Sequence, residues 1–390
     1  MVHGSEPLHG RRLRIVHVAA CPFPSSQGTQ VYIRGLARAL ARRGHDVTVV
    51  CYGHGQGPLD SEYRVVRTPS IPGYRRMRSG PDVVKPLLDV ALAAQVARVD
   101  ADVVHAHNIE GPMAAALAGM LRHRPVLFNA HTSLKEELPT YFQSRPFQWL
   151  GARLGAVVDH SLPRLADASM AIREQHAQVL HQRGVPRVFW VPPGVDAEDL
   201  VETEPWPLPP GPWVVYAGNP DAYQDLQVLF AAMEQLPDVG LLLVGASPFP
   251  QTPSITRRHV VQTTDFSVVR RCLAAADVAA LPRGVCSGFP IKLLNYLGMG
   301  LATVAATGAA ALLPGMVQVE NDNPTAMAQA IRALISQPQQ CHNLGQVGRQ
   351  HVLSSCLWTH RIVDVEEIYA ELMGIGRRRG ILRWTETTIR

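Results

Sequence analysis

The sequence has very little lysine: only Lys85, Lys135 and Lys292 stand among its 37 basic residues, and all the others are arginines. Charged residues make up 18% of the 390 positions and hydrophobic residues 46%, so the chain can bury a core and is not disordered, collagen-like or a coiled coil. The net charge of +5 is spread thinly and forms no stripe of basic and aromatic residues, so we expect no nucleic-acid partner. The rarity of lysine makes the position of each one informative.

Paired cysteines and membrane segments are missing as well. The six cysteines are scattered without C-x-x-C spacing, which argues against a disulfide framework or a zinc site and fits a reducing cytoplasm. The apolar run after Arg14 is interrupted by His17 and ends at Pro22, which is too short for the core of a signal peptide. Residues 301–319 are long enough to cross a bilayer, but their glycines and proline predict a strand, a loop and a turn. We therefore expect no membrane span.

Short apolar runs alternate with longer amphipathic ones, which is the pattern of a parallel α/β sheet. The predicted strands are 13–18, 47–51, 103–106, 126–129, 188–191, 214–217, 241–244, 260–261, 278–281 and 301–305, and the clearest predicted helices are 31–43, 226–233, 291–297 and 358–373. Polar residues such as His107 and His131 follow the ends of strands, where open α/β sheets build their sites.

The length predicts two sizeable domains. A turn at 192–196 separates two series of strands, and the stretch 206–212 is rich in proline and glycine. We expect a Rossmann-like domain over residues 1–195, a second over 196–357, and a long helix with a basic tail over 358–390.

Four segments carry a resemblance to glycosyltransferase family 4, a group of retaining enzymes with the GT-B fold. The first comprises Ser26–Val31, Leu36–Leu40 and Gly44–Val47, and the others are Asp102–His107, Val191–Asp196 and Ser287–Tyr296. Their order and spacing make the match specific. The resemblance implies two Rossmann-like domains facing an interdomain cleft, with the C-terminal helix crossing back to the first domain. It implies a nucleoside diphosphate sugar as co-substrate, held mostly by the second domain, with no further cofactor, no metal and retention of anomeric configuration.

A phosphate site is predicted around residue 290. Gly288, Phe289 and Pro290 precede a predicted helix, whose first N–H groups and dipole can receive an anion. Lys292 lies in the first turn, where a cation opposes the helix dipole unless an anion binds nearby, so it is the predicted phosphate ligand. Arg283, just before this loop, can assist it. The alternatives are a solvated surface lysine and an exposed loop arginine.

The chain departs from the common family pattern at charged positions. Family members usually place a Glu at each end of a seven-residue spacer, where this chain has Ser287 and Asn295. An Arg and a Lys usually follow the first strand of the second domain, after the residue that is Gly218 here; this chain has Asn219 and Gln224. These residues can still bind a donor through hydrogen bonds, but they bring no charge. The missing charges leave open a catalytically impaired sugar-nucleotide-binding protein. A sugar-nucleotide epimerase is the other alternative, but it would require acid/base carboxylates in the cleft, and the helix motif lacks them.

The first domain offers two further donor contacts. His131 matches the family's histidine beside the donor sugar, and we expect it to bind the transferring sugar and help position the acceptor; the alternative is a core histidine. Gly28 has no side chain, which would allow its loop to approach the diphosphate, although turn geometry explains a glycine equally well.

Two polar motifs are interpreted as structural. His105 and His107 have metal-ligand spacing, but no third ligand is near in the sequence. Asp100 and Asp102 resemble an Asp-x-Asp metal motif, yet they precede a strand as an ordinary polar turn.

A basic cluster at 75–78 leaves two interpretations open. Arg75, Arg76 and Arg78, flanked by Tyr74 and Met77, form either a solvated loop or a contact with an anionic membrane that presents a lipid-linked acceptor. The acceptor itself, whether a glycan, a lipid-linked molecule or a small molecule, has no motif. We expect a cytoplasmic enzyme, with peripheral association at the inner face of the membrane under the second interpretation.

Overall fold

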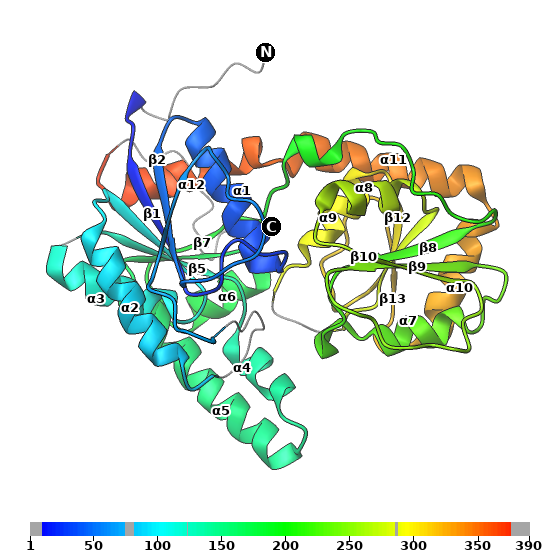
Figure 1. Ribbon diagram of the computed structural model, residues 1–390, viewed down its shortest axis with the longest axis horizontal. Helices are drawn as coiled ribbons and strands as arrows, with labels where there is room; N and C mark the ends of the chain where they lie inside the picture. Colours follow the sequence, from blue (N-terminus) through cyan, green and yellow to red (C-terminus); the bar gives the residue numbers. More distant parts are fainter. Residues whose placement is uncertain (1–9, 75–81, 123, 285–287, 376–390) are drawn as a thin grey trace. The chain divides into compact units, whose positions relative to one another are not determined.

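The computed structural model describes residues 10–74, 82–122, 124–284 and 288–375 (Figure 1). The chain divides into two compact units. Unit 1 consists of Met1–Gly194 and Trp358–Arg390, and unit 2 consists of Val195–Leu357. Each unit is built on one parallel sheet, as the alternation of apolar runs predicts.

The sheet of unit 1 has seven parallel strands in the order β3-β2-β1-β4-β5-β6-β7. The strands are β1 (Arg14–Ala19), β2 (Asp46–Cys51), β3 (Arg64–Arg67), β4 (Val103–His107), β5 (Val126–Ala130), β6 (Ala168–Ala171) and β7 (Val188–Trp190). The central strands are buried along almost their whole length, which explains their continuous apolar sequences.

Helices cover both faces of this sheet (Figure 1). They are α1 (Gly28–Arg42), α2 (Lys85–Arg98), α3 (Gly111–Arg122), α4 (Leu134–Glu137), α5 (Arg145–Ser161), α6 (Glu174–Gln182) and α12 (Trp358–Leu372). Alternate residues of β1 serve opposite faces: Val16 and Val18 pack in one core with Leu88 and Leu92 of α2, whereas His17 lies on the other face. Two short 3₁₀ helices, η2 (Leu138–Tyr141) and η3 (Leu162–Leu165), flank α5.

The long helix predicted at 358–373 is confirmed as α12, and it packs against α1 within unit 1. Its Trp358 fits against Gly35 of α1 and Gly194, and a Cβ at either glycine would clash with the indole. The buried carboxylate of Glu366 accepts a hydrogen bond from Arg43 at 2.7 Å and lies 2.9 Å from Nε2 of His45. These contacts join the end of the chain to its beginning.

Unit 2 has six parallel strands in the order β10-β9-β8-β11-β12-β13. They are β8 (Trp213–Ala217), β9 (Gly240–Gly245), β10 (Arg258–Gln262), β11 (Val278–Leu281), β12 (Ala302–Ala306) and β13 (Met316–Val319). The helices are α7 (Leu226–Met233), α8 (Phe266–Ala274), α9 (Ile291–Gly298), α10 (Pro324–Ile335) and α11 (Pro338–Ser355), with 3₁₀ turns η4 (Ala197–Leu200) and η5 (Ala222–Gln224). Side chains of α7 and α10 share one core with the sheet, and those of α8 and α9 share cores on the other face.

Several elements were not predicted from the sequence. Strands β3, β6 and β13 have only four residues each, and β3 and β13 are partly buried edge strands, so their apolar pattern is weak.

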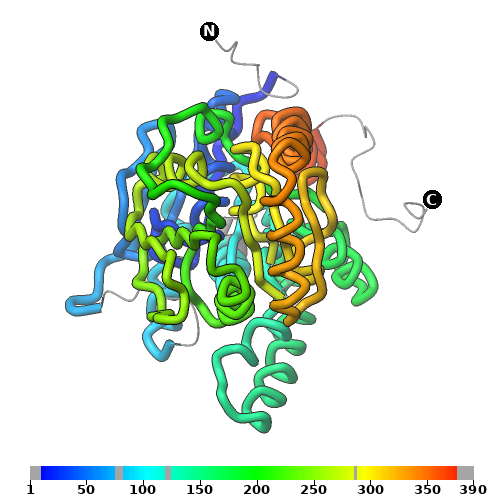
Figure 2. Tube along the Cα trace, turned by 90° about the vertical axis from the view of Figure 1, so that its right-hand side faces the viewer, coloured from blue at the N-terminus to red at the C-terminus, as the bar shows by residue number. Residues whose placement is uncertain are grey.

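The proline-rich stretch 206–212 lies inside unit 2, where the Trp206 N–H donates to the carbonyl of Arg271. Figures 1 and 2 both show α4 and α5 projecting from the rest of unit 1. None of the described helices is long and apolar enough to cross a membrane.

Candidate functional site

A cluster of polar side chains surrounds the start of α9 in unit 2. Lys292 is the second residue of α9, so its predicted place in the first turn is confirmed. Its Nζ donates to the Tyr216 hydroxyl at 2.8 Å and to Oε1 of Gln224 at 3.0 Å, and lies 4.2 Å from the centre of the Tyr216 ring. The lysine is therefore held by neutral groups and an aromatic face.

A second cation lies in the same cluster. Arg283 is only 5% exposed, donates to the carbonyl of Gly288 at 2.8 Å and stacks over the ring of Tyr223. Neither Arg283 nor Lys292 forms an ion pair with a carboxylate in the described part of the chain, and Nε of Arg283 has no partner there. Burial, and then the charge of Arg283, hold the pKa of Lys292 well below its usual value. Two cations without a carboxylate partner make a site suited to an anion.

Glycines bring the backbone close to this cluster. Gly218 follows β8 with φ of 150°, and a Cβ there would collide with Nζ of Lys292. A Cβ on Gly245, at the end of β9, would collide with the carbonyl oxygen of Gly218. Only glycine at position 218 therefore leaves Lys292 room beside the end of the strand.

The loop after β8 contributes backbone and amide groups. Gln224 is buried and accepts from Lys292, whereas the Asn219 amide donates to Asp221. The carbonyl of Asn219 accepts from the Tyr216 hydroxyl at 2.7 Å. Asp225 adopts a left-handed conformation and accepts from the Gly284 N–H at 2.7 Å, which ties this loop to the loop that carries Arg283.

The other residues of unit 2 that were predicted to bind the donor belong to α9 or come just before it in the sequence. Gly288 lies against Arg283 through its carbonyl, and Phe289 packs on the apolar core below α9. Pro290 is the N-cap of α9, so it directly precedes the helix, as predicted from the sequence. Asn295 is partly buried on α9, and Ser287 lies outside the described residues.

The structure thus brings Gly218, Gln224, Arg283, Gly288 and Lys292 together. The sequence prediction missed Tyr216 and Tyr223, because their rings belong to a strand and a loop with no motif of their own. The only available hint was that Tyr216 is a polar residue in an apolar strand that ends at a glycine.

A chain of hydrogen-bonded histidines lies in unit 1, on the face of the sheet that α1 and α12 contact. Nδ1 of His17 lies 2.9 Å from Nε2 of His107, and Nδ1 of His107 lies 3.1 Å from Nε2 of His131. All three are at most 6% exposed. Burial lowers the pKa of His17 and of His131 to about 3, so these imidazoles are neutral at pH 7.

Neutral imidazoles fix the direction of this chain. Each link needs one N–H donor and one lone pair. If His17 donates to His107 and His107 donates to His131, the buried Nε2 of His17 is left with an unpaired lone pair and not with an unpaired N–H. The opposite direction would bury an unpaired N–H, which proteins rarely do. The first direction costs less, and it places an N–H at Nδ1 of His131, to which no hydrogen-bond partner is assigned among the described residues.

The predicted structural role of His105 and His107 rested on the lack of a third ligand, and the structure supplies one. His17, on the neighbouring strand, brings three imidazoles within 4.8 Å of one another, a donor set that can bind a transition metal. However, both nitrogens of His107 already form hydrogen bonds, and its ring plane lies only 21° from that of His105 and 30° from that of His17. Stacked rings do not aim their lone pairs at one point, so the geometry favours the hydrogen-bonded chain.

Two tyrosines that the sequence prediction missed complete the histidine cluster. The Tyr369 hydroxyl lies 2.6 Å from Nδ1 of His105, and the Tyr32 ring packs edge-on against His131 at 4.9 Å. Tyr369 comes from α12, at the far end of the chain. Gly28, predicted as a donor contact, is the first residue of α1, and a Cβ there would meet no described atom within 4 Å.

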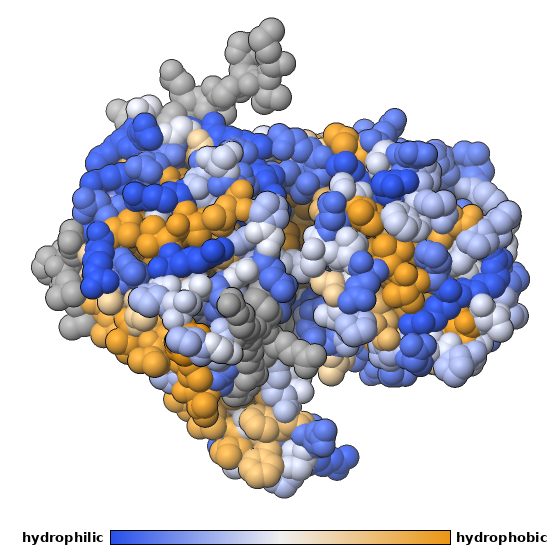
Figure 3. Space-filling view, viewed as in Figure 1, coloured by the Kyte–Doolittle hydropathy of each residue, from blue (hydrophilic) through white to orange (hydrophobic). Residues whose placement is uncertain are grey.

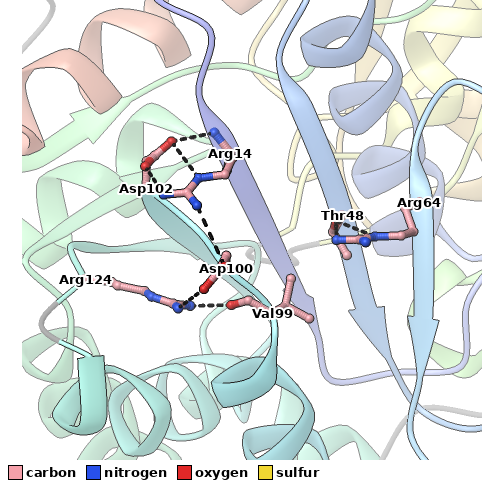
Figure 4. A network of polar contacts seen from close by, with 7 residues as sticks. All are labelled: Arg14, Thr48, Arg64, Val99, Asp100, Asp102 and Arg124. Carbon is pink, nitrogen blue, oxygen red and sulfur yellow. Dashed lines mark hydrogen bonds and ion pairs between the residues drawn. The ribbon is translucent and has the colours of Figure 1, made fainter.

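The carboxylates at 100 and 102, just before β4, are held by arginines at the beginning of β1 and just before β5 (Figure 4). Asp102 accepts from Nη2 and from the backbone N–H of Arg14, each at 2.8 Å, and Asp100 lies 3.4 Å from Nη2 of Arg124. These ion pairs fasten neighbouring strands. They lie at the opposite end of β4 from His107, which agrees with the structural interpretation of this motif.

Comparison with known proteins shows what kind of protein has this architecture. Residues 26–199 match the model of the family described as Glycosyltransferase Family 4, and residues 211–337 match that of Glycosyl transferases group 1. Phosphatidyl-myo-inositol mannosyltransferase of Mycobacterium tuberculosis is 25% identical over 314 residues, which cover 75% of this chain and 78% of the relative.

Solved structures agree on the fold. Sucrose-phosphate synthase from Thermosynechococcus elongatus superposes with a TM-score of 0.75 at 19% identity, covering 93% of this chain and 100% of that one. The Anabaena protein HepE, solved in complex with UDP-glucose, gives a TM-score of 0.68 at 14% identity, covering 93% and 100% of the two chains.

The two parallel sheets and these neighbours define a glycosyltransferase of the GT-B fold. Its two matched regions follow one another along most of the sequence, in the order that the motifs predicted. The chain belongs to glycosyltransferase family 4, glycosyl transferases group 1.

Proposed function

We propose that this glycosyltransferase takes its sugar from a nucleoside diphosphate sugar and transfers it with retention of anomeric configuration. The observation that carries the proposal is the pair of cations at the start of α9. Lys292 and Arg283 are held close to the helix N-terminus without a carboxylate partner in the described residues. A diphosphate supplies the missing negative charge and also accepts from the first N–H groups of the helix.

The chemistry of transfer explains why these cations matter. As the bond between the anomeric carbon and the diphosphate oxygen breaks, negative charge grows on the leaving diphosphate. Lys292 and Arg283 would stabilise that charge, in place of the Arg and Lys that the family usually has at the positions of Asn219 and Gln224. The proposal therefore needs no further cofactor. The complex of the structural neighbour HepE with UDP-glucose supports this class of donor.

His131 is proposed to donate a hydrogen bond from Nδ1 to a hydroxyl of the transferring sugar. The direction of the histidine chain supports a donor at this atom, because His107 already occupies Nε2. In a retaining reaction without a protein nucleophile, the departing phosphate itself accepts the proton of the acceptor hydroxyl. His131 would then act by orientation and not as a base, in agreement with the low pKa that burial gives it.

A lipid-linked acceptor is proposed from the curated relatives. The M. tuberculosis relative is a mannosyltransferase named for phosphatidyl-myo-inositol, and several other matching proteins carry the same name. An acceptor embedded in lipid requires contact with a membrane surface. Arg75, Arg76 and Arg78 would contribute to such a contact, although they lie outside the described residues.

Nucleotide binding and product analysis test the proposal. The full chain is titrated with UDP, GDP and ADP by calorimetry, and the tight-binding nucleotide is then supplied as its sugar conjugates. We expect slow release of free sugar whose newly formed anomer, read by NMR before mutarotation, matches that of the donor. Release of the opposite anomer would refute retention, and tight binding without any turnover would favour a binding protein. Conversion of the donor into an epimer would favour an epimerase.

A further inference from the structure

Helix α5 of unit 1 exposes its large apolar side chains. Phe147, Trp149, Leu150, Leu154 and Val157 are 44–64% exposed, and we refer to these five residues as the α5 face. Exposed single hydrophobic residues are ordinary on protein surfaces, but five on one helix form a patch. Figure 3 shows apolar side chains gathered over α5 and the adjoining α2.

The buried side of α5 explains why the apolar side chains face outward. The helix packs through Gly151, Gly155 and Asp159, which follow one another at intervals of four residues. A Cβ on Gly155 would collide with the backbone of Leu134, and Asp159 accepts from the Ser133 hydroxyl at 2.6 Å. Small and polar residues of α5 therefore face the protein, and its large apolar residues face outward. This is the reverse of a surface helix in a water-soluble protein, whose apolar side faces the core.

The exposed ionisable side chains on α5 and η3 are all basic. The exposed ionisable side chains of α5 and η3 are Arg145, Arg153, His160 and Arg164, and the single carboxylate of this segment, Asp159, is buried. The guanidinium of Arg153 lies 4.8 Å from the centre of the Trp149 ring. Aromatic and aliphatic side chains next to arginines, with no exposed acid on α5 or η3 themselves, match a bilayer interface that contains anionic lipids.

Neighbouring elements extend the apolar surface. Leu87 and Val90 of α2 are 64% and 63% exposed, and Met113 and Leu117 of α3 are exposed too. Helix α2 packs on α3, and α3 packs on η3, the short helix that directly follows α5. Because α4 and α5 project from unit 1 (Figures 1 and 2), the α5 face can reach a planar surface.

We propose that the α5 face inserts into the interface of an anionic bilayer and docks the enzyme there. The helix lies along the interface, because its buried side is fastened to α4 and does not enter lipid. This assignment differs from the basic cluster at 75–78, whose neighbour Tyr74 is held by Asp82 at 2.7 Å and packs against His54. The inference deepens the proposed lipid-linked acceptor, and a binding test without donor or acceptor separates the failure of one from the failure of the other.

The test is sedimentation of the full chain with vesicles of phosphatidylcholine alone or with 30% phosphatidylglycerol. We expect binding to the anionic vesicles that weakens with salt, and quenching of tryptophan fluorescence by brominated lipid that is lost in Trp149→Phe. Phe147→Ser with Leu154→Ser should abolish binding. Replacement of Arg145 and Arg153 by Gln should weaken it about fivefold for each arginine. These variants should keep the nucleotide affinity of the wild-type protein.

The matched control is Val347→Ser on α11, since Val347 is 52% exposed on unit 2 and should not change vesicle binding. Equal binding of the wild-type protein and the Phe147→Ser, Leu154→Ser variant would overturn the proposal, as would the absence of vesicle binding. Light scattering supplies a further check. A stable dimer that the same two substitutions convert to a monomer would show that a second copy of the chain covers the α5 face instead.

Discussion

Replacing Lys292 by Met should weaken nucleotide binding without destabilising the protein. Methionine has nearly the length of lysine and removes only the charge and the donors. In the free protein, Gln224 would lose a hydrogen bond, but a cation that burial disfavours would be removed at the same time. We therefore expect the free energy of unfolding to stay within about 1 kcal/mol of the wild-type value.

The effect on the complex should be much larger. A hydrogen bond between charged partners contributes about 1.5–3 kcal/mol, which corresponds to a loss of about 10- to 150-fold in nucleotide affinity. Lys135→Met is the matched control, because Lys135 is exposed on α4 and its replacement should change neither quantity. Affinity and stability should thus respond in different ways to the same substitution.

The lowered pKa of Lys292 predicts that nucleotide binding depends on pH. Burial and Arg283 lower this pKa in the free protein, and a bound diphosphate raises it again because opposite charges favour the ammonium form. Between the two pKa values, binding takes up a proton, so nucleotide affinity falls as pH rises through that window. The Lys292→Met variant has no such group and should bind with a weaker dependence on pH.

Calorimetry in buffers of different ionisation enthalpy measures affinity and proton uptake together, and urea unfolding measures stability. We expect proton uptake for the wild-type protein and for Lys135→Met, and none from this site in Lys292→Met. Unchanged affinity in Lys292→Met would refute the assignment of the phosphate site. A large loss of stability would instead show that the lysine is a structural part of the loop.

Two further predictions concern the histidine chain. Burial lowers the pKa of His17 and of His131 to about 3, against 6.5 in the unfolded chain. As the pH falls below 6.5, the unfolded state therefore binds more protons than the folded state, and the folded state loses stability. Lowering the pH from 7 to 5 should therefore cost about 2 kcal/mol for each independently titrating imidazole, and a urea midpoint that does not change over this range would contradict the reasoning. His107→Leu, which removes the partner of His131, should lower kcat about tenfold with a smaller change in KM, whereas His107→Gln, whose amide can donate, should recover part of the loss. Equal kcat in the wild-type protein, His107→Leu and His107→Gln would show that the hydrogen bond between His107 and His131 does not position His131.

Parts of the site were predictable because they depend on local sequence. Lys292 was placed in the first turn of a helix from the glycine and proline before it and the apolar spacing after it, and α9 bears this out. His131 was placed at the end of a strand by the apolar run 126–129, as β5 shows. Periodicity and turn residues act over a few positions, so a single sequence contains them in full.

Other parts depend on which elements become neighbours. The His17 partner of His107 lies 90 residues away and is brought there by the parallel register of β1 and β4. Tyr369 reaches His105 only because α12 packs in unit 1. Tyr216, a neutral hydrogen-bond partner of Lys292, lies on β8, 76 residues away. No local pattern encodes these pairings, because they follow from strand order and helix docking.

The α/β class, the alternation of strands and helices and the family could all be predicted from the sequence, since these follow from composition, short-range periodicity and the order of motifs. Which polar residues meet depends on the packing of distant elements, and this packing brings Lys292 and Arg283 together without a carboxylate partner among the described residues. It also decided which side of α5 is buried: hydrophobic residues usually face the core, and here glycines and an aspartate do so instead. Burial and hydrogen bonding depend on the whole packed unit, and these long-range properties set the chemistry of each side chain.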